Sequence, residues 1–288
     1  MIYETKKNNR KQKKEKLHFL YYNLEKKIWK RLILKIIISH WFNIICSFYL
    51  KTFISKIHIK KILKKANINI ALFEKQKFKS YNDFFIRKYK NIFFCKDPNI
   101  FISPGEGFIR ICPILTHNHY TIKQTKYHLS DLLKNDSLPN YYNKGYLVIL
   151  RLAPTNYHRY IFIDNGSMLH HPIKIKGKLH TVQPIAFKYY NVFHENSREY
   201  SILQTNNFGK IIQVEVGALL IGKINNHRIY NFNKGEEKGF FSIGGSTIVL
   251  LVKTNMVDFN SNILKRSAKN LETKVNLGQS IGRKKCIF

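Results

Sequence analysis

A glycine-rich segment of the sequence contains a serine whose hydroxyl could react with the adjacent peptide bond. The segment runs from Lys234 to Thr247 as Lys-Gly-Glu-Glu-Lys-Gly-Phe-Phe-Ser-Ile-Gly-Gly-Ser-Thr, and an apolar run follows it. The hydroxyl of Ser246 could attack the preceding carbonyl and form an ester, provided that a base accepts its proton and the oxyanion is stabilised. Gly245 leaves that carbonyl open and permits unusual backbone angles. The structural alternative is a glycine-rich hairpin that enters a buried strand.

Several other segments precede this serine in a fixed order. They are 78–88 (FKSYNDFFIRK), 103–107 (SPGEG), 156–160 (NYHRY), 164–166 (DNG), 180–184 (HTVQP), 195–200 (ENSREY) and 214–218 (VEVGA). Together with the Lys-Gly-Glu-Glu and Gly-Gly-Ser-Thr motifs, they resemble the pyruvoyl-dependent phosphatidylserine decarboxylases, particularly the bacterial branch. The resemblance covers roughly residues 17 to 285.

The resemblance implies a proenzyme that cuts itself between Gly245 and Ser246. Ser246 would then become a pyruvoyl group, the cofactor of the family. That group condenses with the amine of phosphatidylserine and accepts the electron pair released as CO₂ leaves, so that phosphatidylethanolamine is formed. The implied products of cleavage are a β chain, residues 1–245, and an α chain, residues 246–288, which remain together as a heterodimer.

Two positions depart from the family pattern. The family uses an Asp–His–Ser relay for self-cleavage; Glu106 occupies the Asp position and Ile161 occupies the His position. His158 is retained, and by resemblance it assists decarboxylation and reprotonation. Because isoleucine cannot accept a proton, three outcomes remain open: an imidazole such as His158 substitutes, processing is slow, or the protein is a degraded relative.

Other side chains could contribute to this site. His180, His170 and His171 are candidate substitutes for the missing base, although each is also explained as a structural histidine. By resemblance, His180 is also a candidate contact for the substrate. Arg198 and Lys234 could meet a phosphate, but individual cations mean little in so basic a chain.

The charge of the chain favours a polyanionic partner. Lys and Arg number 50 against 17 Asp and Glu, a formal net charge of +33. An anionic membrane surface and nucleic acid both fit such a surplus, and a general drift toward Lys, Asn and Ile fits it too. The cysteines are scattered (Cys46, Cys95, Cys112 and Cys286), so no metal site is expected. The basic N-terminus has no apolar signal-peptide core, and reduced thiols on the cytoplasmic side are expected.

The pattern of charged, apolar and turn-forming residues along the sequence predicts an α+β protein in three parts. Residues 1–16 form a basic flexible arm, and residues 17–97 form a helical, membrane-associating region whose apolar run is too short and polar to span a bilayer. A helical subdomain that packs on the catalytic core fits the pattern of residues 17–97 equally well. Residues 98–288 form a β-rich, barrel-sandwich-like catalytic core. Strands are expected at Gly145–Leu152, His158–Ile163, Lys210–Ile224 and Ser246–Lys253. The polar tail after Asn255 is expected to be peripheral.

The leading hypothesis is a phosphatidylserine decarboxylase that lies peripherally on the cytoplasmic side of the cell membrane. Two alternatives remain. A pseudoenzyme of the same fold would bind membranes without maturing. A basic nucleic-acid-binding protein would explain the charge, but the sequence has no helix-turn-helix, RNP or zinc-finger pattern, and no nucleic acid is expected as a partner.

Overall fold

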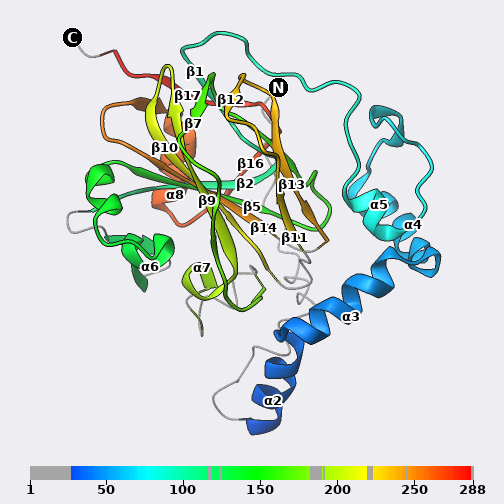
Figure 1. Ribbon diagram of the computed structural model, residues 1–288. Helices are drawn as coiled ribbons and strands as arrows, with labels where there is room; N and C mark the ends of the chain where they lie inside the picture. Colours follow the sequence, from blue (N-terminus) through cyan, green and yellow to red (C-terminus); the bar gives the residue numbers. More distant parts are fainter. Residues whose placement is uncertain are drawn as a thin grey trace.

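An antiparallel β-sheet body carries an N-terminal helical arm that extends away from it (Figure 1). The computed structural model describes residues 27–115, 119–122, 125–181, 190, 192–218, 223–243 and 246–286. Residues 1–16, which the sequence predicts to be a basic flexible segment ahead of the helices, lie outside these ranges. Helices make up 28% and strands 33% of the structure, which confirms the α+β class and the N-terminal helices. The sheets are open and do not close into a barrel.

Short helices joined by caps and turns form the N-terminal arm. They are α2 (Ile28–Ile37), α3 (His40–Lys51), η2 (Phe53–Lys56), α4 (Ile57–Ala66), η3 (Ile70–Leu72) and α5 (Tyr81–Phe85). The side chain of Ser39 accepts from the backbone N–H of Phe42 at the start of α3, and Ser80 caps α5 in the same way. Asn67, at φ 49°, ends α4 in the left-handed conformation.

The main sheet is antiparallel and has nine strands. Their order is β12-β7-β9-β10-β14-β5-β2-β16, and β8 also pairs with β9. The bounds are β2 (Gly107–Pro113), β5 (Tyr146–Leu152), β7 (Gly166–Met168), β8 (Ile173–Ile175), β9 (Arg198–Thr205), β10 (Gly209–Val216), β12 (Asn231–Phe232), β14 (Ser246–Val252) and β16 (Thr273–Val275).

Strand β14 lies inside this sheet, between β10 and β5. Ile248 and Leu250 belong to one apolar cluster, whereas Val249 and Leu251 belong to a second cluster on the opposite face. Every residue of β14 is buried. Burial on both faces explains why this strand reads as a continuous apolar run rather than as an alternation.

Smaller elements complete the fold. A three-stranded sheet has the order β1-β17-β15, a second has the order β11-β13-β6, and β3 pairs with β4. Their bounds are β1 (Ile100–Ile102), β3 (His119–Ile122), β4 (Thr125–His128), β6 (Arg159–Ile161), β11 (Lys223–Asn226), β13 (Glu237–Ser242), β15 (Val257–Phe259) and β17 (Ser280–Lys284). The remaining helices are α6 (Leu129–Leu133), η5 (Leu138–Tyr142), α7 (Val192–Glu195) and α8 (Ser261–Ala268).

Two expectations from the sequence are wrong. The run Lys210–Ile224 is not one strand: β10 ends at Val216, and β11 begins at Lys223 in another sheet. The tail after Asn255 is not peripheral, because it supplies β15, α8, β16 and β17, and its apolar residues join the core. Those residues stand singly or in pairs among polar ones, so the sequence pattern alone does not show that they are buried. The core members are Val257, Phe259, Ile263, Val275 and Ile281.

Candidate active site

Ser246 is the first residue of β14 and is completely buried. Its backbone pairs with Leu152 of β5. Its hydroxyl forms no hydrogen bond to any residue that the structure describes. Leaving a buried hydroxyl unsatisfied costs about 1–3 kcal/mol, and the hydroxyls of Ser201 and Thr247 share this state, so it leaves Ser246 available for reaction without distinguishing it from them.

Contacts on either side of Ser246 bring other motifs to it. Ile243, three residues earlier, belongs to an apolar cluster with Phe85. Ile248, two residues later, lies against Gly105, where an added Cβ would stand 3.5 Å from its Cδ1 atom. Gly244 and Gly245 lie outside the described residues. Ile243 itself has φ 33°, an outlier for a β-branched residue, so the backbone is strained immediately before the glycine pair.

His158 is completely buried beside the same apolar cluster. Its ring packs on that of Phe85, with the centroids 3.8 Å apart. Its Nδ1 lies 2.9 Å from the backbone oxygen of Asn156. Because a carbonyl oxygen can only accept, this contact places a proton on Nδ1 and leaves Nε2 as the basic nitrogen of a neutral ring.

Asn156 connects Glu106 to His158. Its side-chain amide donates to Glu106 Oε1 at 2.7 Å, while its backbone carbonyl accepts from His158. The second oxygen of Glu106 accepts from the hydroxyl of Tyr89 at 3.2 Å. Sequence reasoning missed both partners. Asn156 could have been found from its place in the 156–160 motif, but Tyr89 had no sequence signal.

Burial shifts the pKa values of Tyr89 and Arg87, two titratable side chains beside Glu106 and Asn156. Burial, followed by the neighbouring carboxylate of Glu106, raises the pKa of Tyr89, so its hydroxyl remains a donor. Burial also lowers the pKa of Arg87, and the charge of Glu106 opposes that shift. Arg87 Nη2 donates to the backbone oxygen of Asn156 at 2.9 Å, the same atom that holds His158.

Ile161, at the position of the relay histidine, cannot act as a base. Its side chain is completely buried in the apolar cluster that contains Leu152 and Ile248. Its backbone N–H donates to the oxygen of Pro104 at 2.9 Å, which ties β6 to the turn that carries Glu106. The described contacts therefore leave His158 as the imidazole linked to Glu106.

The other candidate histidines have different surroundings. His180 is buried, and its ring stacks on Tyr190 with the centroids 4.1 Å apart. Burial lowers the pKa of His180, and Glu195, whose Oε2 lies 3.5 Å from Nε2, opposes this shift. His170 Nδ1 contacts the backbone oxygen of His171 at an exposed turn. None of these described contacts involves Ser246 or Glu106.

Arg198 and Lys234 use their charges on backbone carbonyls. Arg198 donates to the oxygens of four residues and is 2% exposed. Lys234 Nζ donates to the oxygens of Asp97 and Ile100, at 2.6 and 2.7 Å. Arg198 therefore ties α6 to α7, Lys234 holds the segment that leads into β1, and the expectation that they could hold a phosphate has no support in these contacts.

A cavity of about 580 Å³ is lined in part by Glu106. Tyr89 and Glu106 supply polar groups to its wall, and Leu72, Ile92 and Leu277 supply apolar ones. The C-terminal loop 276–279 closes one side. Glu106 therefore borders a cavity whose volume is sufficient for a small solute.

The helical arm exposes large apolar side chains beside lysines. Trp41, Phe48 and Phe53 are 78%, 74% and 74% exposed. Further exposed members are Ile28, Leu32, Ile36, Ile45, Ile54 and Ile57, with Lys35, Lys51, Lys56, Lys60, Lys61, Lys64 and Lys65 on the same helices. Within the described part of the chain, no single helix is long and apolar enough to cross a membrane. The pair α2–α3 passes together by length and composition, with a bend of 56°.

Comparison with known proteins points to one family. The family model described as phosphatidylserine decarboxylase matches residues 81–283. The chain is 41% identical to phosphatidylserine decarboxylase proenzyme 2 of Clostridium acetobutylicum, over 94% of this chain and 92% of that protein. It is 42% identical to the phosphatidylserine decarboxylase proenzyme of Clostridium botulinum, over 85% of each chain. The proenzyme of Ruminiclostridium cellulolyticum is 38% identical, over 88% of this chain and 87% of its own length.

Proposed function

Because the chain belongs to the phosphatidylserine decarboxylase family, we propose that it is a proenzyme that cuts itself between Gly245 and Ser246 and then decarboxylates phosphatidylserine. The observation that carries the proposal is the set of contacts around Asn156. That residue joins Glu106 to His158, and the buried hydroxyl of Ser246 has no competing hydrogen bond within the described residues.

His158 is the proposed base for self-cleavage. Its Nε2 takes the hydroxyl proton of Ser246 while the oxygen attacks the carbonyl carbon of Gly245, and the amide bond is exchanged for an ester. Loss of the Cα proton of Ser246 then expels the carboxylate of Gly245, and water releases ammonia. Glu106 acts through Asn156, which fixes the ring and stabilises the positive charge that His158 gains.

The residues present fit the pyruvoyl group that the family uses. Ser246 supplies the carbon skeleton, and its burial keeps the product of the cut away from bulk water. When formed, the group supplies an electron sink for the pair of electrons released with CO₂. His158 is also the proposed donor of the proton that replaces CO₂ on the substrate carbon, through the same Nε2 that accepts the proton of Ser246 during self-cleavage.

The fold supports a heterodimer after the cut. Residues 246–288 provide β14 inside the main sheet, β16 at its edge and β17 between β1 and β15. Strand β14 pairs over its whole length with β5 and along most of it with β10. The α chain is therefore interleaved with the β chain and has no route out without breaking these ladders.

The helical arm is the proposed membrane contact, and the protein is proposed to lie peripherally on the cytoplasmic side of the cell membrane. Aromatic and aliphatic side chains exposed beside lysines suit the interface of an anionic bilayer. Each Lys or Arg near such a surface adds about 1 kcal/mol of attraction. Contact with the bilayer would bring a lipid substrate to a domain whose reacting groups are buried.

Mass spectrometry of the purified protein tests the proposal. We expect two fragments, residues 1–245 and 246–288, with a pyruvoyl group at the start of the smaller one. Ser246→Ala should remain intact, and His158→Ala should mature at least about 100-fold more slowly. A wild-type chain that stays intact after long incubation with phosphatidylserine vesicles would refute the proposal and leave a non-processing relative.

A further inference from the structure

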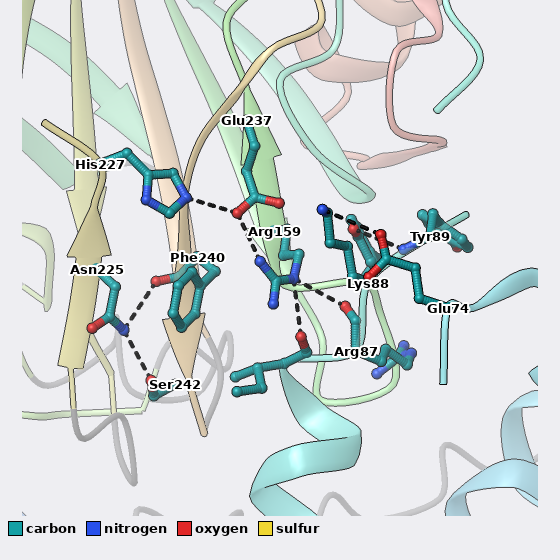
Figure 2. Close-up of polar contacts among 12 residues, drawn as sticks. Glu74, Arg87, Lys88, Tyr89, Arg159, Asn225, His227, Glu237, Phe240 and Ser242 are labelled. Atoms are coloured by element: carbon teal, nitrogen blue, oxygen red, sulfur yellow. Dashed lines mark hydrogen bonds and ion pairs between the residues drawn. The ribbon is translucent and has the colours of Figure 1, made fainter. Parts of the chain in front are cut away.

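Arg159 and Glu237 form a largely buried ion pair next to the proposed site. Arg159 Nη1 lies 2.7 Å from Glu237 Oε1, and each side chain is 15% exposed. His227 Nε2 contacts the same oxygen at 2.8 Å (Figure 2). Glu237 Oε2 is buried and has no hydrogen bond among the described residues. Removing either partner would leave a charge buried with too few contacts.

Arg159 also holds the end of helix α5. Its Nε donates to the backbone oxygens of Ile86 and Arg87, at 2.9 and 3.2 Å. These carbonyls follow the last residue of α5 and have no helical partner ahead of them. The guanidinium also lies over the ring of Phe240, 4.8 Å from its centroid. Only the planar fork of arginine can serve the carboxylate and the two carbonyls together.

The segment that Arg159 holds is the one that contacts His158. Phe85 packs on the ring of His158, and Arg87 donates to the backbone oxygen that fixes its Nδ1. Two independent contacts therefore run from the end of α5 to this imidazole. A shift of that segment would move the support of the ring and the partner of its nitrogen at once.

The pair also joins β6, which begins directly after His158, to β13, which precedes Ser246 in the chain. Arg159 follows His158 directly in the chain. Strand β13 begins at Glu237 and leads through Ile243 toward Ser246. The backbone N–H of Phe241 donates to the oxygen of His158 at 2.9 Å, so β13 is in register with the imidazole residue itself. A change in the spacing of these strands would change the distance over which a proton must pass.

We propose that Arg159 and Glu237 are positioning residues that aim His158 at Ser246 by clamping the end of α5 to β13. This inference rests on the proposed self-cleavage. It also gives a role to the second glutamate of the Lys-Gly-Glu-Glu motif: Glu237, nine positions before Ser246, sets the position of the base.

The first test is the rate of self-cleavage in folded protein. We expect Glu237→Gln and Arg159→Lys each to slow the cut by roughly tenfold. Arg159→Lys keeps both charges of the ion pair. Slower self-cleavage in this variant would therefore identify the planar geometry of the guanidinium group, rather than its charge, as the cause. Arg151 and Glu272 form the matched control pair, with contacts at 2.9 and 2.6 Å in the same protein. Arg151→Lys and Glu272→Gln should stay within about twofold of wild type.

The second test does not depend on cleavage. In a Ser246→Ala background labelled with ¹⁵N-histidine, the Nδ1 proton of His158 should give a slowly exchanging signal, which His158→Gln identifies by its loss. Adding Glu237→Gln should broaden that signal or speed its exchange at least fivefold, whereas adding Glu272→Gln should not. Glu237→Asp serves if the glutamine variant does not fold.

The outcomes separate the two proposals. If wild type cleaves and Glu237→Gln cleaves within twofold of it, or the His158 signal is unchanged, the positioning role is wrong while the proposed function stands. If wild type does not cleave, the proposed function fails, and the NMR comparison still decides whether the pair orders His158.

Discussion

The side-chain amide of Asn156 lies 2.7 Å from the carboxylate of Glu106, and its backbone carbonyl holds Nδ1 of His158. One residue thus connects a carboxylate and an imidazole that come from different segments of the chain. A longer acid in place of aspartate is compatible with this arrangement, because the link runs through an intervening amide.

Replacement of Asn156 by Asp tests that link. The variant keeps the shape of the side chain and the oxygen that accepts from the backbone N–H of Ala153. It also puts a second carboxylate against that of Glu106. Two carboxylates this close repel each other when both are ionised, so one of them takes up a proton more readily as the pH falls and can then donate as the amide does. We expect self-cleavage roughly tenfold slower than wild type at about pH 8, with the difference narrowing toward lower pH. Equal rates at every pH would show that the amide has no role.

Chemical rescue tests Glu106. Glu106→Ala should slow self-cleavage by about 10²–10⁴-fold. The cavity of about 580 Å³ at this residue is large enough for acetate or formate, so either anion should restore part of the rate in a saturable manner. His158→Ala is the control, because a carboxylate in the cavity cannot replace its proton acceptor. Rescue of both variants alike would mean that the anion acts in solution.

Native chromatography tests the interleaving of the two chains. After the cut, residues 1–245 and 246–288 should elute together at the size of the uncut protein and separate only in denaturant. The physical reason is that β14, β16 and β17 are hydrogen-bonded to strands of the larger fragment. Release of the smaller fragment in native buffer would contradict the proposed heterodimer.

Vesicle binding tests the helical arm. Phe48→Asp and Phe53→Asp should each weaken binding to anionic vesicles at least tenfold, since burying one such side chain is worth about 1.5–3 kcal/mol. Leu271→Asp is the matched control, because Leu271 is 48% exposed on the sheet domain. Equal losses in all three variants would place the membrane contact elsewhere.

Acid stability should depend on His194 of α7. Burial lowers its pKa from 6.5 to about 4, against the opposing effect of Asp131. Between these values the unfolded state binds more protons than the folded state, so stability is complete above about pH 6.5 and falls as the pH drops toward 4. The loss is on the order of 3 kcal/mol. Denaturant unfolding from pH 7 to 4 should show a smaller slope in His194→Gln than in wild type, and an unchanged slope would exclude His194 as the source.

The sequence by itself determined the family of the protein and the position of the serine that we propose to react. The Gly-Gly-Ser-Thr motif is contiguous, and the apolar run after it predicts the buried strand that β14 forms. The strands at 145–152 and 246–253 were also predicted, because local composition and turn residues mark their ends. Such features depend on neighbours in the chain.

Only the tertiary structure decided which side chains contact Glu106 and Glu237. Asn156 is 50 positions from Glu106, and Arg159 is 78 positions from Glu237, so no local pattern could pair them. The polar tail after Asn255 became core for the same reason: its isolated apolar residues are buried by strands that are distant in sequence. Contacts of this kind follow from strand order and register, and a local stretch of sequence does not show with which distant strand it pairs.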